Sequence, residues 1–139
     1  MHDGATTAVV VNGLTKTFRT GDRPALKDVS FAAGRGEMVA LIGASGSGKS
    51  TLIRHLAGLT TADRHGAGEV AVLGRTMQRG GRTGGETRRL RADVGVIFQQ
   101  FNLVDRLTLL TNVLMGVLGR APAWRTALGR FTDGERRQA

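Results

Sequence analysis

The chain has 139 residues, of which 40% are hydrophobic and only 4% aromatic, and it contains no cysteine. This length fits one domain or part of a larger one, and the lack of cysteine excludes disulfides and suits an intracellular site. No run of eighteen apolar residues is present, and the start, Met-His-Asp-Gly-Ala-Thr-Thr, lacks the pattern of a signal peptide. A soluble intracellular protein is therefore expected.

The net charge is +9, and only Lys16, Lys27 and Lys49 among the 20 basic residues are lysines. Such a charge suits nucleic acid, an anionic membrane surface or anionic ligands. The arginines are dispersed along the chain and are not set with aromatic residues on one strand. We therefore attribute them to a compositional habit and expect no nucleic-acid partner.

Short strands are predicted before residue 43. Residues 8–11 form the first, a turn or irregularity falls at Asn12 and Gly13, and alternation resumes over residues 14–18. Residues 26–33 form the second strand after a loop. The continuous apolar run of residues 38–42 predicts a third strand, buried on both faces.

A glycine-rich loop, residues 43–51, joins this third strand to a predicted helix, on which Leu52, Ile53, Leu56 and Leu59 share one face. The loop matches G-x-x-x-x-G-K-S, in which glycines let backbone N–H groups curl around phosphates at a helix N-terminus. Lys49 would supply an ammonium for the β- and γ-phosphates, and the Ser50 hydroxyl would bind Mg²⁺. The pattern predicts a site for ATP or another nucleoside triphosphate with Mg²⁺, made by Gly43, Ser45, Gly46, Ser47, Gly48, Lys49, Ser50 and Thr51.

The rest of the chain alternates between loops and short elements. We expect a loop over residues 60–68, a strand ending in a turn over 69–75, an Arg- and Gly-rich mobile surface loop over 77–85, and a short helix beginning within 86–90. A second buried strand is predicted over 94–98 and a helix over 108–118, with Thr108 as a candidate N-cap and Thr111 at position N3. The histidines, His2, His55 and His65, are expected on the surface or on a helix face.

Read together, residues 14–18, 26–31 and 36–43 resemble the nucleotide-binding subunit of ABC transporters in order and spacing, and the resemblance covers nearly the whole chain. Residues 94–99 resemble the Q-loop strand of that family, and residues 107–113 the helix that follows it. Within the family, the chain resembles the ATP-binding subunit of phosphonate importers through residues 72–76, 98–104, 118–119 and 124–126. The resemblance implies an α/β fold, a P-loop NTPase core with an N-terminal antiparallel β subdomain.

The resemblance also assigns roles to residues. Phe18 would stack on adenine, since any base offers a π-face to a ring. Gln99 would contact Mg²⁺ and the attacking water, and would report γ-phosphate occupancy to the membrane subunit. Gln100 is the alternative if the register differs by one residue. Lys49 and Gln99 are thus the candidate catalytic residues, and Ser50 and Gln99 the candidate metal ligands.

Three motifs of the family have no counterpart in the sequence: the Leu-Ser-Gly-Gly-Gln signature, the apolar Walker B strand ending in Asp-Glu, and a later switch histidine. Residues 83–86, Thr-Gly-Gly-Glu, faintly resemble the signature but precede the Q-loop, so we reject them. The resemblance therefore implies that residues 1–139 are the N-terminal part of one nucleotide-binding domain, truncated before the signature and Walker B. Alone, such a chain would turn over ATP negligibly.

The implied function is the ATP-binding subunit of an importer that couples ATP hydrolysis to uptake of phosphonate or a related small anion. Its partners would be a second ATP-binding subunit, permease subunits and, indirectly, a solute-binding protein, at the cytoplasmic face of the bacterial inner membrane. Three alternatives stay open: another ABC importer, a small P-loop kinase or GTPase, and a basic nucleic-acid-binding module. The strands before the loop and the segment at Phe98 and Gln99 argue against the kinase or GTPase.

Overall fold

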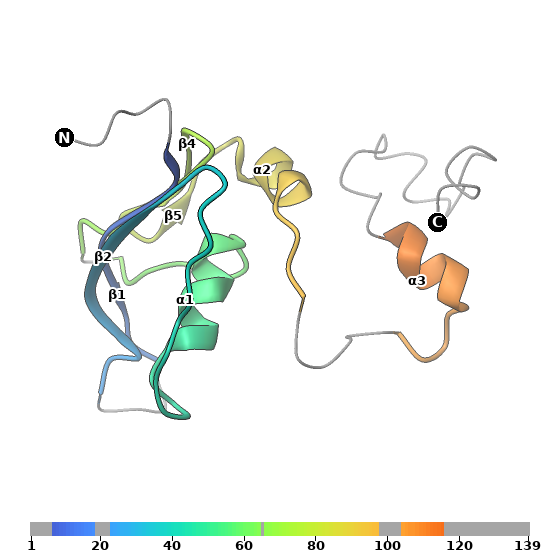
Figure 1. Ribbon diagram of the computed structural model, residues 1–139, viewed down its shortest axis with the longest axis horizontal. Helices are drawn as coiled ribbons and strands as arrows, with labels where there is room; N and C mark the ends of the chain where they lie inside the picture. The colour runs from blue at the N-terminus through green and yellow to red at the C-terminus, as the bar shows by residue number, and fades with distance from the viewer. Residues whose placement is uncertain (1–6, 19–22, 65, 98–103, 116–139) are drawn as a thin grey trace. The chain divides into compact units, whose positions relative to one another are not determined.

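A computed structural model describes residues 7–18, 23–64, 66–97 and 104–115. The chain forms two compact units, residues 1–90 and 91–139, which we describe separately. Figure 1 labels their elements, which are β1 (Thr7–Lys16), β2 (Leu26–Gly34), α1 (Lys49–Leu56), β3 (Glu69–Val72), β4 (Arg75–Arg79), β5 (Arg82–Thr83), α2 (Thr87–Asp93) and α3 (Leu109–Met115). None of the described helices is long and apolar enough to cross a membrane.

The first unit is built on an antiparallel sheet with the strand order β2-β1-β3-β4-β5, and α1 contacts β3. This sheet agrees with the expected N-terminal antiparallel β subdomain. Its core lies where the apolar residues of the sheet meet those of α1 and the following loop. The buried apolar residues are Val11, Leu14, Leu26, Leu52, Ala57, Ala62, Val70, Val72, Met77 and Leu90.

The irregularity predicted at Asn12 and Gly13 is confirmed inside β1. Residues three apart on a regular strand point to opposite faces, yet Val11 and Leu14 are both fully buried. The pairing with β2 shifts register between these two residues, and Gly13 adopts a φ of 54°. This bulge-like irregularity restores the inward direction of Leu14, so Val11 and Leu14 both face the core.

The Arg- and Gly-rich segment of residues 77–85 is not the loop that we predicted. Most of it belongs to β4 and β5, which pair as an antiparallel hairpin across Gly80 and Gly81. Both glycines have positive φ, as a tight hairpin turn requires. Composition misled the prediction, because buried Met77 and Gln78 fix this strand to the core despite its polar neighbours.

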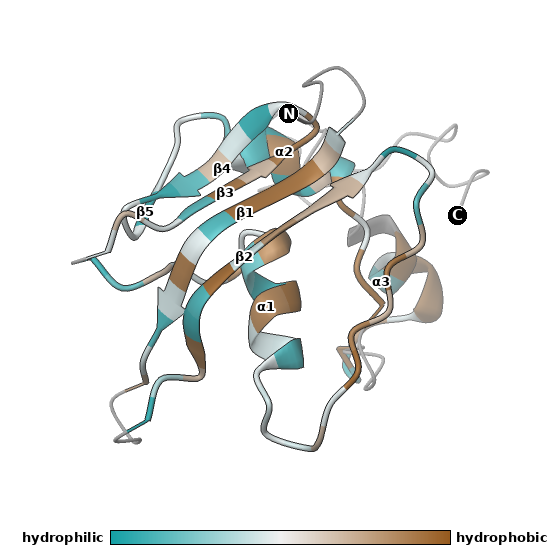
Figure 2. Cartoon of the chain, turned by 60° about the vertical axis from the view of Figure 1, so that its left-hand side comes forward, coloured by the Kyte–Doolittle hydropathy of each residue, from teal (hydrophilic) through white to brown (hydrophobic). Residues whose placement is uncertain are grey.

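The two predicted buried strands are also wrong in the described residues. Residues 37–44 and 94–97 pair with no strand there, and Met38, Ile42 and Ile97 are almost completely exposed. Figure 2 colours the segment before α1 as hydrophobic, as the prediction assumed. A strand of this kind needs hydrogen-bonded neighbours on both sides, and no described strand supplies them. Phe98 lies outside the described residues.

An open apolar groove of about 430 Å³ lies beside the segment that leads into α1. Two helix residues, Ile53 and Leu56, face it together with Val39 and Leu41 of the extended segment. Of the four apolar residues predicted on one helix face, Leu52 is buried and Leu56 half-buried, whereas Ile53 and Leu59 are 39% and 55% exposed. The helix therefore packs on the sheet along a narrower stripe than the sequence predicts.

The second unit contains α3, within the range predicted for a helix. Thr108 is its N-cap, as predicted, because its Oγ1 accepts the Thr111 N–H at 3.2 Å. The Asn112 side chain holds the preceding turn: its Oδ1 accepts the Val104 N–H at 2.8 Å, and its Nδ2 donates to the Val104 carbonyl at 3.2 Å. Residues 116–118 of the predicted helix lie outside the described residues.

Candidate phosphate-binding site

The glycine-rich loop of residues 43–48 is closed by the side chain of Lys49. The Lys49 Nζ donates to the carbonyl oxygens of Gly43 and Ala44, at 2.6 and 2.8 Å, and to the Ser47 Oγ at 3.2 Å. The Ser47 N–H donates to the Ala44 carbonyl at 3.2 Å, which tightens the same turn. The ammonium thus lies within the curve of the loop, where an anion held by that loop would meet it.

Gly48 leads into α1 in a conformation that favours glycine. Its φ is 91°, in the left-handed region, and a Cβ at this position would lie 2.3 Å from the Ala25 carbonyl oxygen. Ala25 in turn donates its N–H to the Lys16 carbonyl at 2.7 Å. The start of α1 is therefore joined, through Ala25, to the end of β1.

The N-terminus of α1 suits an anion. The first N–H groups of a helix have no intrahelical acceptor, and the helix dipole is positive at this end. The first turn carries no acidic residue, Ser50 is exposed and Thr51 is half-buried. Ser45, Gly46 and Ser47 are exposed in the loop before it. The start of α1 therefore brings together backbone N–H donors, the Lys49 ammonium and the exposed Ser50 side chain.

Phe18 lies just beyond the end of β1 and is 43% exposed. The Lys16 Nζ lies over its ring, 5.5 Å from the centroid, as a cation–π pair does. The exposed part of the ring is available for stacking on a planar group. Gln99 and its register alternative Gln100 lie outside the described residues, so their predicted roles stay predictions.

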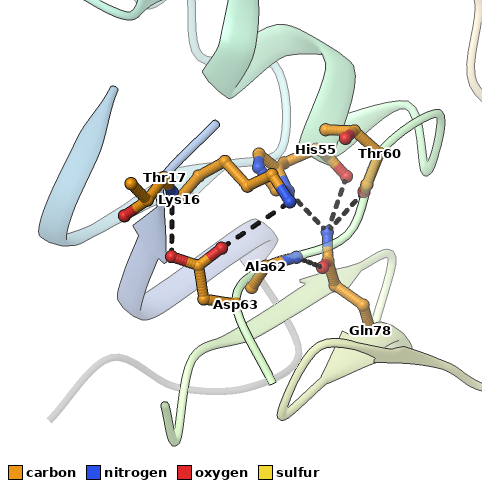
Figure 3. A network of polar contacts seen from close by, with 7 residues as sticks. All are labelled: Lys16, Thr17, His55, Thr60, Ala62, Asp63 and Gln78. Atoms are coloured by element: carbon orange, nitrogen blue, oxygen red, sulfur yellow. Dashed lines mark hydrogen bonds and ion pairs between the residues drawn. The ribbon is translucent and has the colours of Figure 1, made fainter. Parts of the chain in front are cut away.

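A buried polar network, which no pattern in the sequence predicts, joins α1 and β4 (Figure 3). His55 on α1 is fully buried and Gln78 on β4 is 1% exposed, and the Gln78 Nε2 lies 3.1 Å from the His55 Nδ1. Of the two placements expected for His55, the surface is wrong and the helix face is right, because the residue lies buried on α1. His2 and His65 lie outside the described residues.

The backbone around Gln78 fixes the orientation of its amide. The Ala62 N–H donates to the Gln78 Oε1 at 2.8 Å, so the Nε2 must face His55 and the Thr60 carbonyl, which it reaches at 3.2 Å. The His55 Nδ1 is consequently the acceptor, and its proton lies on Nε2. Burial lowers the pKa of His55, and the nearby charge of Lys16 lowers it further. His55 is therefore held neutral.

The residues present fit a magnesium–triphosphate group. The loop closes around a lysine ammonium, the Gly48 backbone is packed so closely that no side chain fits, and a serine hydroxyl follows at the helix start. The ammonium and the backbone N–H groups can donate hydrogen bonds to phosphate oxygens, and the hydroxyl oxygen can bind the metal ion. The loop and the first turn of α1 bring together all the predicted phosphate-binding residues.

The chain has the three features of a P-loop protein of the nucleoside-triphosphate-binding class: a glycine-rich loop, a lysine within it and a helix that begins at the loop. The ABC transporter family model matches residues 26–138, so the chain belongs to the ABC transporter family. This membership disfavours the small kinase or GTPase and the nucleic-acid-binding module.

Within this family, the chain is similar to curated ATP-binding proteins of phosphonate import. The chain is 61% identical over 132 residues to the phosphonates import ATP-binding protein PhnC of Stutzerimonas stutzeri, a match that covers 95% of this chain and 47% of the relative. It is 58% identical over 129 residues to PhnC 1 of Pseudomonas aeruginosa strain UCBPP-PA14, covering 93% of this chain and 46% of that protein. The chain thus spans about half the length of the curated relatives it matches.

Solved structures agree on the fold. The crystal structure of a nucleotide-free ATP-binding cassette from an ABC transporter matches with a TM-score of 0.66 at 23% identity, over 95% of this chain and 51% of that one. A second ATP-binding cassette of an ABC transporter matches with a TM-score of 0.60 at 26% identity, over 91% of this chain and 47% of that one. The expected α/β fold of an ABC ATPase is thereby confirmed for this part of the domain.

Proposed function

We propose that this chain is part of the ATP-binding subunit of an ABC importer that takes up phosphonate or a related small anion. The observation that carries the proposal is the 61% identity, over 95% of the chain, to a phosphonates import ATP-binding protein. Residues 1–139 would then be the N-terminal part of one nucleotide-binding domain.

The site residues would act on the triphosphate of ATP. Lys49 would bind the β- and γ-phosphates, and the N–H groups of the loop and first turn would hold the phosphate oxygens. Ser50 would bind Mg²⁺, which neutralises phosphate charge when present. Phe18 would stack on adenine, and Gln99 would contact the metal ion and orient the attacking water.

The same proposal includes partners and a location. A second ATP-binding subunit would complete the site in a dimer, and permease subunits would receive the conformational change. The helix that begins after Thr108 would lie near the permease, and a solute-binding protein would deliver the anion. The subunit would work at the cytoplasmic face of the bacterial inner membrane.

Uptake of a radiolabelled phosphonate by cells tests this function. Deleting the gene that encodes the whole subunit should abolish uptake, and the complete wild-type gene should restore it. Lys49→Ala should not restore it, because the ammonium that binds the phosphates is lost. Lys27→Ala is the matched control, since Lys27 is an exposed lysine on β2 and is not among residues 43–51. Undiminished uptake in the deletion strain would contradict the assignment.

A further inference from the structure

One loop residue, Asp63, holds the end of β1 through three consecutive residues. Its Oδ2 accepts the Thr17 N–H at 2.8 Å, its Oδ1 lies 3.6 Å from the Lys16 Nζ, and its own N–H donates to the Thr15 carbonyl at 3.1 Å. Figure 3 shows the carboxylate between Thr17 and Lys16. The side chains of Lys16 and Asp63 are only 18% and 30% exposed, so solvent screens this pair less than a surface ion pair.

Phe18 follows directly after the residues that Asp63 holds. The Thr17 N–H bond fixes the backbone one residue before the ring, and the Lys16 ammonium that pairs with Asp63 lies over the ring itself. Asp63 therefore restrains Phe18 from two sides, through the main chain and through a cation. Without these restraints an exposed aromatic residue beyond a strand end would sample several rotamers.

The loop that carries Asp63 is itself anchored. The buried amide of Gln78 accepts from the Ala62 N–H and donates to the Thr60 carbonyl, and it also reaches the carbonyl and ring of His55 on α1. Since α1 is the helix that begins at Lys49, the loop is fixed to the same helix that presents the phosphate-binding residues. Asp63 thus connects the backbone just before Phe18 to α1, the helix that begins in the P-loop.

We propose that Asp63 is a positioning residue that sets the ring of Phe18 to receive the base of ATP, and that the His55–Gln78 pair keeps Asp63 in place. The inference rests on the proposed function, because it requires Phe18 to contact the base. It explains why a fully buried histidine and glutamine, remote in sequence, lie under the loop beside the end of β1. This role requires contacts of Asp63 with the end of β1 and none with the nucleotide itself.

Comparing Mg-ATP with Mg-tripolyphosphate on the full chain, by calorimetry, tests this role. Tripolyphosphate engages the P-loop but has no base. Asp63→Ala should weaken ATP binding about fivefold to tenfold while tripolyphosphate binding stays unchanged, because only the base contact is lost. Asp63→Asn should recover most of the loss, since its amide oxygen can still accept the Thr17 N–H.

Glu69→Ala is the matched control, because it breaks the Glu69–Arg79 ion pair on the sheet without touching the end of β1. It should leave the ratio of the two affinities unchanged. Equal losses for both ligands in Asp63→Ala and Asp63→Asn, or no loss in either, would overturn the positioning role. If the folded wild-type chain binds neither ligand, the proposed function fails first, and the inference fails with it.

Discussion

The carbonyl oxygen of Ala25 lies so close to Gly48 that a Cβ on Gly48 would sit 2.3 Å from it. This approach brings the P-loop against the strand end that precedes Phe18, because Ala25 is also hydrogen-bonded to Lys16. A backbone contact without side chains therefore links the phosphate-binding loop to the aromatic residue proposed for the base. The relationship explains why glycine is required at this position for packing as well as for conformation.

Replacing Gly48 by alanine should destabilise the chain by about 2 kcal/mol or more, from the left-handed φ and from the clash with backbone. Gly46→Ala is the matched control: its φ is 79°, but a Cβ there would meet nothing within 4 Å. We expect that control to cost about 1 kcal/mol. Urea unfolding curves measure both, and equal losses would contradict the close packing of Gly48.

Gln78→Leu should cost about 2–3 kcal/mol of stability. It leaves the Ala62 N–H and the His55 Nδ1 without their partner in the protein interior. A buried polar group without a partner costs more free energy than the net contribution of one hydrogen bond. Thermal unfolding of wild type and variant measures this. A change below about 0.5 kcal/mol would mean that the buried network contributes little.

The network also predicts a pH dependence. The pKa of His55 is lowered by burial and by Lys16, against the smaller opposing effects of Gln78, Asp63 and Thr60. The unfolded chain therefore takes up a proton at about pH 6.5, before the folded chain does. The stability from neutral His55 should be complete above that pH and be lost as the pH falls below it, until the lowered folded pKa is reached.

The pH dependence is measured by urea unfolding between pH 7.5 and 5 in wild type and His55→Met. The wild type should lose up to about 1.4 kcal/mol per pH unit more than the variant below pH 6.5. Parallel profiles would show that His55 titrates equally in the folded and unfolded chains.

Asn112→Ala should release the turn before α3. The Val104 N–H donates to the Asn112 Oδ1, so its exchange with deuterium should accelerate severalfold when that acceptor is removed. Thr108→Ala is a useful comparison, because it removes the N-cap oxygen but leaves the Asn112 contacts. Unchanged exchange at Val104 in Asn112→Ala would contradict this contact.

The sequence predicts those structural features that are determined by residues close together in the chain. The irregularity in β1 follows from Asn12 and Gly13, the start of α1 from the residues of the P-loop, and the α3 cap from Thr108. The candidate phosphate-binding residues are predictable for the same reason, since they are contiguous in sequence.

What the sequence could not predict depends on distant partners. The apolar runs at residues 38–42 and 94–97 look like buried strands, but a strand forms only where neighbours complete its ladder. His55 and Gln78 are 23 residues apart on different elements, and Asp63 lies in a polar loop with no motif. No periodicity or spacing in a single sequence indicates that these three residues lie in one network.

Calorimetric titration of the folded chain with Mg-ATP tests the central claim most directly. We expect measurable, weak binding in the wild type, and a loss of about tenfold or more in affinity in Lys49→Ala, where the phosphates lose their ammonium partner. Lys27→Ala should bind as the wild type does. No heat of binding at millimolar Mg-ATP, from a chain shown to be folded, would contradict nucleotide binding by residues 43–51.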